Sequence, residues 1–151
     1  MSRGNVFRLV LAAAAVLAVG AMLTRLNRVM LPEGPVDILW DREVCEHCKM
    51  HIGDPRFAAQ LQTTDGDVVS FDDPGCLFEY LQTHPTDVHA LYFRDYDGDQ
   101  WLSQAEAGFL PVGDSPMGYG IRAVSKETPG AHDWAWAQTR ALERKQHEGG
   151  H

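Results

Sequence analysis

Apolar positions along the chain follow two different periods, and the change of period predicts the order of the elements. Residues 57–63, FAAQLQT, alternate apolar and polar positions, and residues 68–73, VVSFDD, follow after the turn sequence TDGD. This arrangement is typical of a β-hairpin. In DDPGCLFEYLQTH the apolar positions recur at helical spacing, which predicts a helix with Asp73 as its N-cap. The run HALYFR, residues 89–94, predicts a third strand, so the expected order is ββαβ.

The second half of the chain shows weaker patterns. The segment WLSQAEAGFL, residues 101–110, predicts a short helix capped by Ser103, and GYGIRAVS, residues 118–125, predicts another strand. Residues 133–146 predict a terminal amphipathic helix with basic side chains in its last turns. The tail 147–151 is expected to be disordered. Together these elements predict an α+β fold.

The first thirty residues differ from the rest of the chain. An uncharged apolar run of 15 residues extends from Leu9 to Leu23, with arginines on both sides. A membrane-spanning helix needs about 20 residues, so the run is closer to a signal-peptide core, with AVGA as its cleavage site. A signal anchor is the alternative, because Arg25 and Arg28 after the run disfavour simple export. A buried helix of a soluble domain is disfavoured, because no polar face interrupts the run.

Both favoured interpretations export the rest of the chain. Residues 1–30 are thus the predicted signal peptide or signal anchor, and residues 31–40, rich in Pro and Gly, are a predicted linker. The 151 residues suffice for one domain with its own core.

The charge of the predicted domain restricts its partners. Four of the 13 basic residues and none of the 21 acidic ones lie in the first thirty positions, so residues 31–151 carry a net charge of −12. A domain this acidic repels phosphate backbones, which argues against nucleic acid as a partner. Basic partners and metal cations are favoured instead.

Seven consecutive positions, CEHCKMH from Cys45 to His51, contain two thiols, a thioether and two imidazoles. Cys76 is the third cysteine, and an odd number in an exported protein leaves at least one thiol unpaired. A redox C-x-x-C pair should open a helix after a strand, but residues 35–43 have a linker-like composition. Structural zinc needs four ligands, usually from a second pair of Cys or His. The chain has no second C-x-x-C, which leaves a soft, incompletely closed metal site.

Monovalent copper fits these donors best, because thiolate and thioether are polarizable ligands that match a soft d¹⁰ cation. One short turn can present Cys45, Cys48 and Met50 to a single ion. Met117 lies in DSPMGYG, a loop flanked by Pro and Gly, where a ligand role is favoured over core packing. These four residues are the predicted metal ligands.

Three other residues near the motif stay ambiguous. His47 and His51 flank the thiols, and each is either a further copper ligand or a solvated side chain. Cys76 follows Gly75 at the start of the predicted helix, where a helix N-terminus favours thiolate. Burial in the core is the more common position for a single cysteine.

The segment DYDGDQWLSQAE, residues 95–106, matches many ligand positions of a calcium-binding EF-hand loop. Gln100 stands where the sharp turn of that loop needs glycine, and a strand rather than a helix precedes the segment. A turn followed by a helix cap is therefore the favoured interpretation.

Five segments, in order and spacing, resemble the NosL family of accessory proteins for nitrous oxide reductase: CEHCKM, FAAQL, FDDPGCLFEYL, DYDGDQWLSQAEAGFL and SPMGYGIRAV. The resemblance extends from Cys45 to Val124. It implies ββαβ units with structural similarity to organomercurial lyase, in a NosL-like copper-binding domain that we place at residues 41–146. The ligands that it implies are Cys45, Cys48, Met50 and Met117.

The resemblance also implies a function. The protein would be a periplasmic copper(I) metallochaperone rather than an enzyme, and Cu(I) would be its cargo. Its expected partners are the nitrous oxide reductase apoprotein, whose copper centres it would help to assemble, and a membrane transporter maturation complex.

Two positions depart from the family pattern. Family members are often lipoproteins, but Ala21 stands where the lipidated cysteine should be. Residues 9–23 would therefore tether the protein to the inner membrane by themselves. Lys49 stands where the family commonly has glycine, which alters the turn between Cys48 and Met50.

Two other functions stay open. A periplasmic thiol:disulfide oxidoreductase would use Cys45 and Cys48 alone, and would not need Met50 or Met117. A zinc-stabilised binding module would use both of these thiols together with Cys76, and would unfold when the metal is chelated.

Overall fold

The computed structural model describes residues 12–20, 22 and 31–148, and the chain forms two compact units, Met1–Met30 and Leu31–His151. In the first unit, residues 12–20 and 22 are helical. Among the described residues, no helix combines the length and the apolar character that crossing a membrane requires. The rest of the predicted signal peptide or anchor, and the last three residues of the predicted tail, lie outside the described residues.

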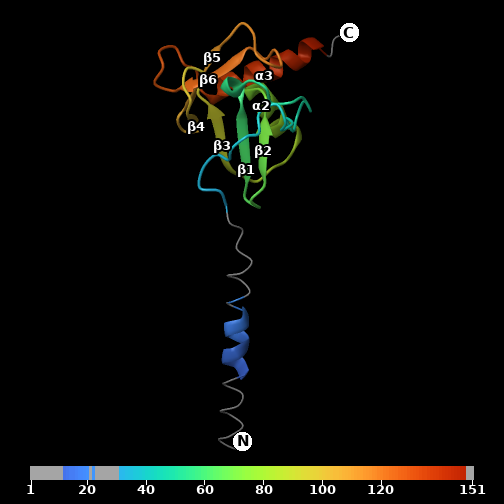
Figure 1. Ribbon diagram of the computed structural model, residues 1–151, viewed down its shortest axis with the longest axis vertical. Helices are drawn as coiled ribbons and strands as arrows, with labels where there is room; N and C mark the ends of the chain where they lie inside the picture. The colour runs from blue at the N-terminus through green and yellow to red at the C-terminus, as the bar shows by residue number, and fades with distance from the viewer. Residues whose placement is uncertain (1–11, 21, 23–30, 149–151) are drawn as a thin grey trace, which may run out of the picture. The chain divides into compact units, whose positions relative to one another are not determined.

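The second unit combines two antiparallel sheets with two helices, and this confirms the predicted α+β class (Figure 1). The larger sheet has the strand order β2-β1-β3-β4, and β5 pairs with β6 in the smaller one. The predicted ββαβ order over residues 57–94 is also found. The elements are η1 (Pro55–Phe57), β1 (Ala59–Thr63), β2 (Val68–Phe71), α2 (Pro74–Thr83), β3 (Val88–Arg94), β4 (Trp101–Ser103), β5 (Ala107–Pro111), β6 (Ile121–Ser125) and α3 (Trp134–Glu148).

Strand β1 is buried on both faces, although its sequence alternates polar and apolar residues. The Gln60 side chain accepts a hydrogen bond from the Val36 N–H and donates one to the Val36 carbonyl, at 2.8 and 3.0 Å. The Gln62 amide donates to the Gly34 carbonyl at 2.6 Å. Part of the predicted linker is therefore fixed on β1 by hydrogen bonds to the side chains of two buried glutamines.

Aromatic rings connect both sheets and both helices in one core. Phe78 of α2 lies with its ring centroid 4.7 Å from that of Trp134 of α3 and 5.6 Å from that of Phe109 of β5. Phe93 of β3 contacts Phe109 edge-on at 5.2 Å. Edge-on aromatic pairs at these distances stabilise the core beyond simple burial, so α2 is held firmly where it carries the site described below.

The prediction of a helix at residues 101–110 is wrong, because this segment forms β4, a turn and β5. Ser103 and Glu106 make the contacts of a helix cap, with the serine N–H and hydroxyl donating to the Glu106 carboxylate at 3.0 and 2.6 Å. These contacts close a turn only. Leu102 pairs with Phe93 across β4 and β3, and this pairing between distant segments overrides the local signal.

Acidic side chains in the segment that matches a calcium loop already have protein partners. Asp97 pairs with Arg122 at 3.1 Å, and Asp99 pairs with Arg94 at 3.5 Å. Asp95 accepts the Asp97 N–H at 3.3 Å. The segment is a turn between two strands, without a helix on either side, which favours the turn interpretation.

Candidate metal centre

Three cysteine sulfurs lie together where the C-x-x-C loop meets α2. The Sγ atoms of Cys45, Cys48 and Cys76 all lie within 4.8 Å of one another, and no disulfide joins them. Cys45 and Cys76 are buried, whereas Cys48 is half-buried. The cluster therefore has two enclosed thiols and one that solvent reaches.

A tight turn brings the first two thiols together. The Cys45 N–H donates to the Met50 carbonyl at 2.8 Å, and the Lys49 N–H donates to the Cys45 carbonyl at 3.0 Å. Lys49 adopts the left-handed backbone conformation, with φ of 62°, which glycine adopts without strain. The turn thus closes with lysine at the position where a glycine was expected.

The same turn is attached to the start of α2 through β2. The Glu46 N–H donates to the Ser70 carbonyl at 3.0 Å, so the loop lies beside the end of β2. Two residues separate β2 from α2, and Asp73 caps the helix by accepting the Gly75 N–H at 2.9 Å. Cys76 therefore lies in the first turn of α2, next to the C-x-x-C loop.

The three thiols change each other's acidity. A hydrogen bond from the Cys76 thiol lowers the pKa of Cys45 to about 5. The same contact, together with burial, raises the pKa of Cys76, and burial raises the pKa of Cys48. At neutral pH the site therefore holds one thiolate stabilised by a neighbouring thiol, and a metal that binds all three sulfurs must displace the remaining protons.

The two predicted methionine ligands lie in different surroundings. Met50 follows the C-x-x-C turn, and 57% of its surface is exposed. Met117 is partly buried against the core, and its N–H donates to the Asp73 carboxylate at 3.2 Å. The Met117 loop is thus fixed at the N-terminus of α2, the end that also carries Cys76.

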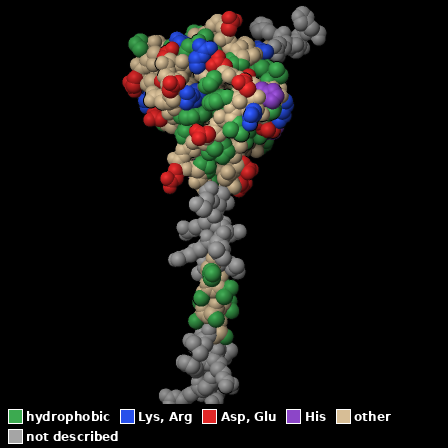
Figure 2. Space-filling model, in the orientation of Figure 1, with side chains coloured by type: hydrophobic (Ala, Val, Ile, Leu, Met, Phe, Trp, Pro, Cys, Tyr) green, Lys and Arg blue, Asp and Glu red, His purple; other side chains and the backbone are tan. Residues whose placement is uncertain are grey.

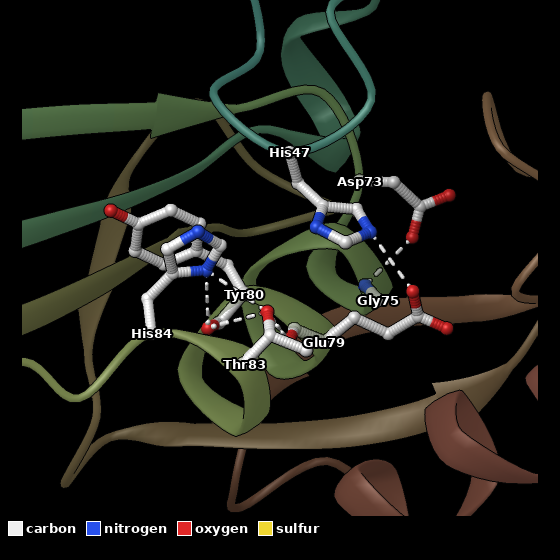
Figure 3. A network of polar contacts seen from close by, with 7 residues as sticks. All are labelled: His47, Asp73, Gly75, Glu79, Tyr80, Thr83 and His84. Carbon is white, nitrogen blue, oxygen red and sulfur yellow. Dashed lines mark hydrogen bonds and ion pairs between the residues drawn. The ribbon is translucent and has the colours of Figure 1, made fainter.

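The two histidines near the thiols also differ. His47 lies with its Nε2 atom 2.9 Å from a carboxylate oxygen of Glu79 on α2 (Figure 3). His51 is exposed and lines an open cavity of about 390 Å³ together with Asp72. Of these two histidines, it is therefore His47 that connects the thiol loop with the helix of Cys76.

Asp72 gives the site a measurable pH dependence. The residue Asp72 is 5% exposed, and burial, followed by the charge of Cys45, raises the pKa of Asp72 to about 6. An unfolded aspartate has a pKa of about 3.9. The folded state binds the proton more tightly, so this group favours folding fully below about pH 4 and loses that contribution as the pH rises through about 6.

We therefore expect Asp72→Asn to raise the free energy of unfolding at pH 7 by about 2 kcal/mol, and to change it little at pH 4. Denaturant unfolding of the metal-free protein at both pH values measures this difference. An equal effect at the two pH values would contradict the raised pKa.

Comparison with known protein families settles the relationship of the chain. The NosL family model matches residues 35–142. The chain belongs to the NosL family. The structure is also similar to the crystal structure of the copper chaperone NosL from Shewanella denitrificans, with a TM-score of 0.53 and 20% sequence identity over 74% of this chain and 89% of that one. A comparison with curated proteins gives no match.

The NosL fold explains which predicted site residues come together. It joins Cys45 and Cys48, as the C-x-x-C spacing indicates, and adds Cys76 from α2. The sequence alone favours a core role for Cys76, and this thiol is indeed buried. Its membership of the cluster depends on the contact between the loop and β2, for which the sequence gives no direct signal.

Proposed function

We propose that this NosL protein is a copper(I) metallochaperone that holds its cargo between Cys45, Cys48 and Cys76. The observation that carries the proposal is the gathering of three free sulfurs within 4.8 Å of one another, with one of them partly open to solvent. Thiolates select soft cations, and Cu(I) is the soft first-row cation. The family membership and the copper chaperone among the similar structures support the same cargo.

Zinc fits the cluster less well than copper. A structural zinc site needs four closed ligands. Among the described His, Cys, Asp and Glu side chains, the group that could hold an ion consists of the three cysteines. Met50 and Met117 remain the candidates for additional soft ligands, because thioethers favour Cu(I) over zinc.

Metal transfer by this site would be an exchange of ligands without a change of oxidation state. Cys45 and Cys76 are buried and would hold the ion, whereas Cys48 is open to an incoming ligand of a partner. The partner's thiolate or thioether would bind the ion before Cys48 leaves it, and the thiols would take up protons after release. Oxidation of Cys45 and Cys48 to a disulfide would abolish the site, so a reducing partner is implied.

The destination of the metal is also a proposal. The protein would act in the periplasm, tethered to the inner membrane by residues 9–23, and would deliver copper for the centres of the nitrous oxide reductase apoprotein beside a membrane transporter maturation complex. Acidic side chains spread over the face shown in Figure 2 are compatible with a cationic cargo and with basic partner surfaces.

A thiol:disulfide oxidoreductase is the second candidate, because the pKa of Cys45 is low. An oxidoreductase needs an accessible thiol of low pKa to attack its substrate. Here the thiol with the lowered pKa is buried, and the pKa of the more accessible Cys48 is raised. This distribution favours a carrier over an enzyme.

An anaerobic titration with Cu(I) against a competing chelator tests the proposed function. We expect tight binding of one ion per chain, and weakening of about tenfold in Met117→Ser and in Met50→Ser, comparable to the loss of an outer-shell partner. Val88→Ser is the matched control for Met50→Ser, since both Val88 and Met50 are exposed apolar residues. Absence of tight binding would contradict the carrier, and unchanged affinity in both variants would exclude the methionines as ligands.

A further inference from the structure

Besides the contact between the thiols themselves, a hydrogen bond between two other side chains connects the segments that supply the thiols. His47 lies between Cys45 and Cys48 in the loop, and its Nε2 atom lies 2.9 Å from the Glu79 carboxylate (Figure 3). The side chains of His47 and Glu79 are 23% and 11% exposed. This partial burial shields the contact from solvent, so it is stronger than a typical surface pair.

Glu79 is placed on the same helix as the third thiol. It follows Cys76 by three residues on α2, and residues at this spacing lie on the same face of a helix. Glu79 also lies near Tyr119: burial raises the pKa of Tyr119, and the charges of Cys76 and Glu79 add to the rise. Glu79 therefore contacts the C-x-x-C loop and lies near Tyr119, which follows Met117 in the next loop.

We propose that Glu79 is a positioning residue of the metal centre: by binding His47, it holds the Cys45–Cys48 loop against α2 before the metal arrives. The inference rests on the proposed copper-carrier function. The Lys49–Glu46 ion pair, at 2.8 Å, stays within the loop, whereas the His47–Glu79 contact crosses to the helix. His47 has a structural role in this arrangement, because its Nε2 atom is hydrogen-bonded to the Glu79 carboxylate.

The physical effect is preorganisation. Without the contact, the loop must be ordered when the ion binds, and that entropic cost reduces the affinity. A hydrogen bond to a charged group contributes enough stability to change an equilibrium by about tenfold or more. Glu79 thus raises the affinity for Cu(I) without touching the ion.

The test compares Cu(I) affinity in the full-length protein and its variants by chelator competition. Glu79→Ala and His47→Ala should each weaken binding by about tenfold. The double variant should be no weaker than either single variant, because both remove the same contact. Glu79→Gln should retain most of the affinity, because its amide oxygen accepts the same hydrogen bond. Asp87→Ala, which removes an exposed carboxylate before β3, is the charge control and should bind like the wild type.

Hydrogen exchange in the copper-free protein provides a second readout that does not depend on metal binding. The Glu46 N–H bonds to the Ser70 carbonyl and therefore reports whether the loop is docked on β2. We expect this amide to exchange about tenfold faster in Glu79→Ala than in the wild type, and at the wild-type rate in Glu79→Gln.

Three results would overturn the positioning role. The first is a Glu79→Ala variant with wild-type Cu(I) affinity and wild-type exchange of the Glu46 amide. The second is an equal loss of affinity in Glu79→Gln and Glu79→Ala. The third is a far larger loss of affinity in His47→Ala than in Glu79→Ala, which would make His47 a ligand. If the wild type itself does not bind Cu(I) tightly, the proposed function fails. The exchange rates of the Glu46 amide then still decide whether Glu79 holds the loop.

Discussion

Replacement of Cys76 by alanine is expected to weaken Cu(I) binding by about a hundredfold or more, since even outer-shell partners of a metal contribute about ten- to a hundredfold. The reason is geometric: the Cys76 sulfur completes the group of three within 4.8 Å, and it is buried beside Cys45. Chelator competition under anaerobic conditions measures the loss. Unchanged affinity would show that the C-x-x-C pair binds the ion without the third thiol.

A second readout separates loss of a ligand from loss of structure. The Cys76 thiol donates the hydrogen bond that lowers the pKa of Cys45. In Cys76→Ala this donor is absent, so the pKa of Cys45 should rise from about 5 toward the ordinary value of a cysteine. Titration of the thiolate ultraviolet absorbance measures this shift. A folded variant with an unchanged thiolate pKa would contradict the contact between the two thiols.

Replacement of Asp73 by alanine is expected to lower the free energy of unfolding by about 3 kcal/mol, from the lost helix cap together with buried donors left unpaired. Asp73 is fully buried and accepts the N–H groups of Gly75 and Met117 at 2.9 and 3.2 Å. It also accepts the hydroxyl of Ser115. Denaturant unfolding of the metal-free protein measures the effect.

The matched control for this variant is Asp54→Ala. Asp54 also caps a short helical segment, η1, by accepting the Arg56 N–H, but its side chain is 31% exposed. Water can replace its contacts, so its removal should change the stability by less than about 1 kcal/mol. If Asp73→Ala and Asp54→Ala lower the free energy of unfolding equally, the buried contacts of Asp73 do not hold the Met117 loop in place.

Elements specified by neighbouring residues were predictable from the sequence. The hairpin β1–β2 follows from two alternating runs around the turn TDGD, where Gly66 adopts a positive φ of 90°. The start of α2 follows from Asp73 as its cap and Pro74 in its first turn. The pair Cys45 and Cys48 likewise needs only a four-residue turn to meet.

Features that depend on distant segments were not predictable in the same way. Ser103 and Glu106 form the same contacts in a turn as in a helix cap, and only the pairing of Leu102 with Phe93 selects the strand. Cys76 joins the other thiols because the loop docks on the end of β2, and Glu79 contacts His47 for the same reason. A single sequence shows neither of these long-range contacts.

X-ray absorption spectroscopy of the Cu(I)-loaded protein most directly tests the three-thiolate site. We expect an all-sulfur coordination shell with at least three sulfur ligands in the wild type, and one sulfur fewer in Cys76→Ala. A shell that contains nitrogen or oxygen, or a sulfur number that does not change in the variant, would contradict the site formed by Cys45, Cys48 and Cys76.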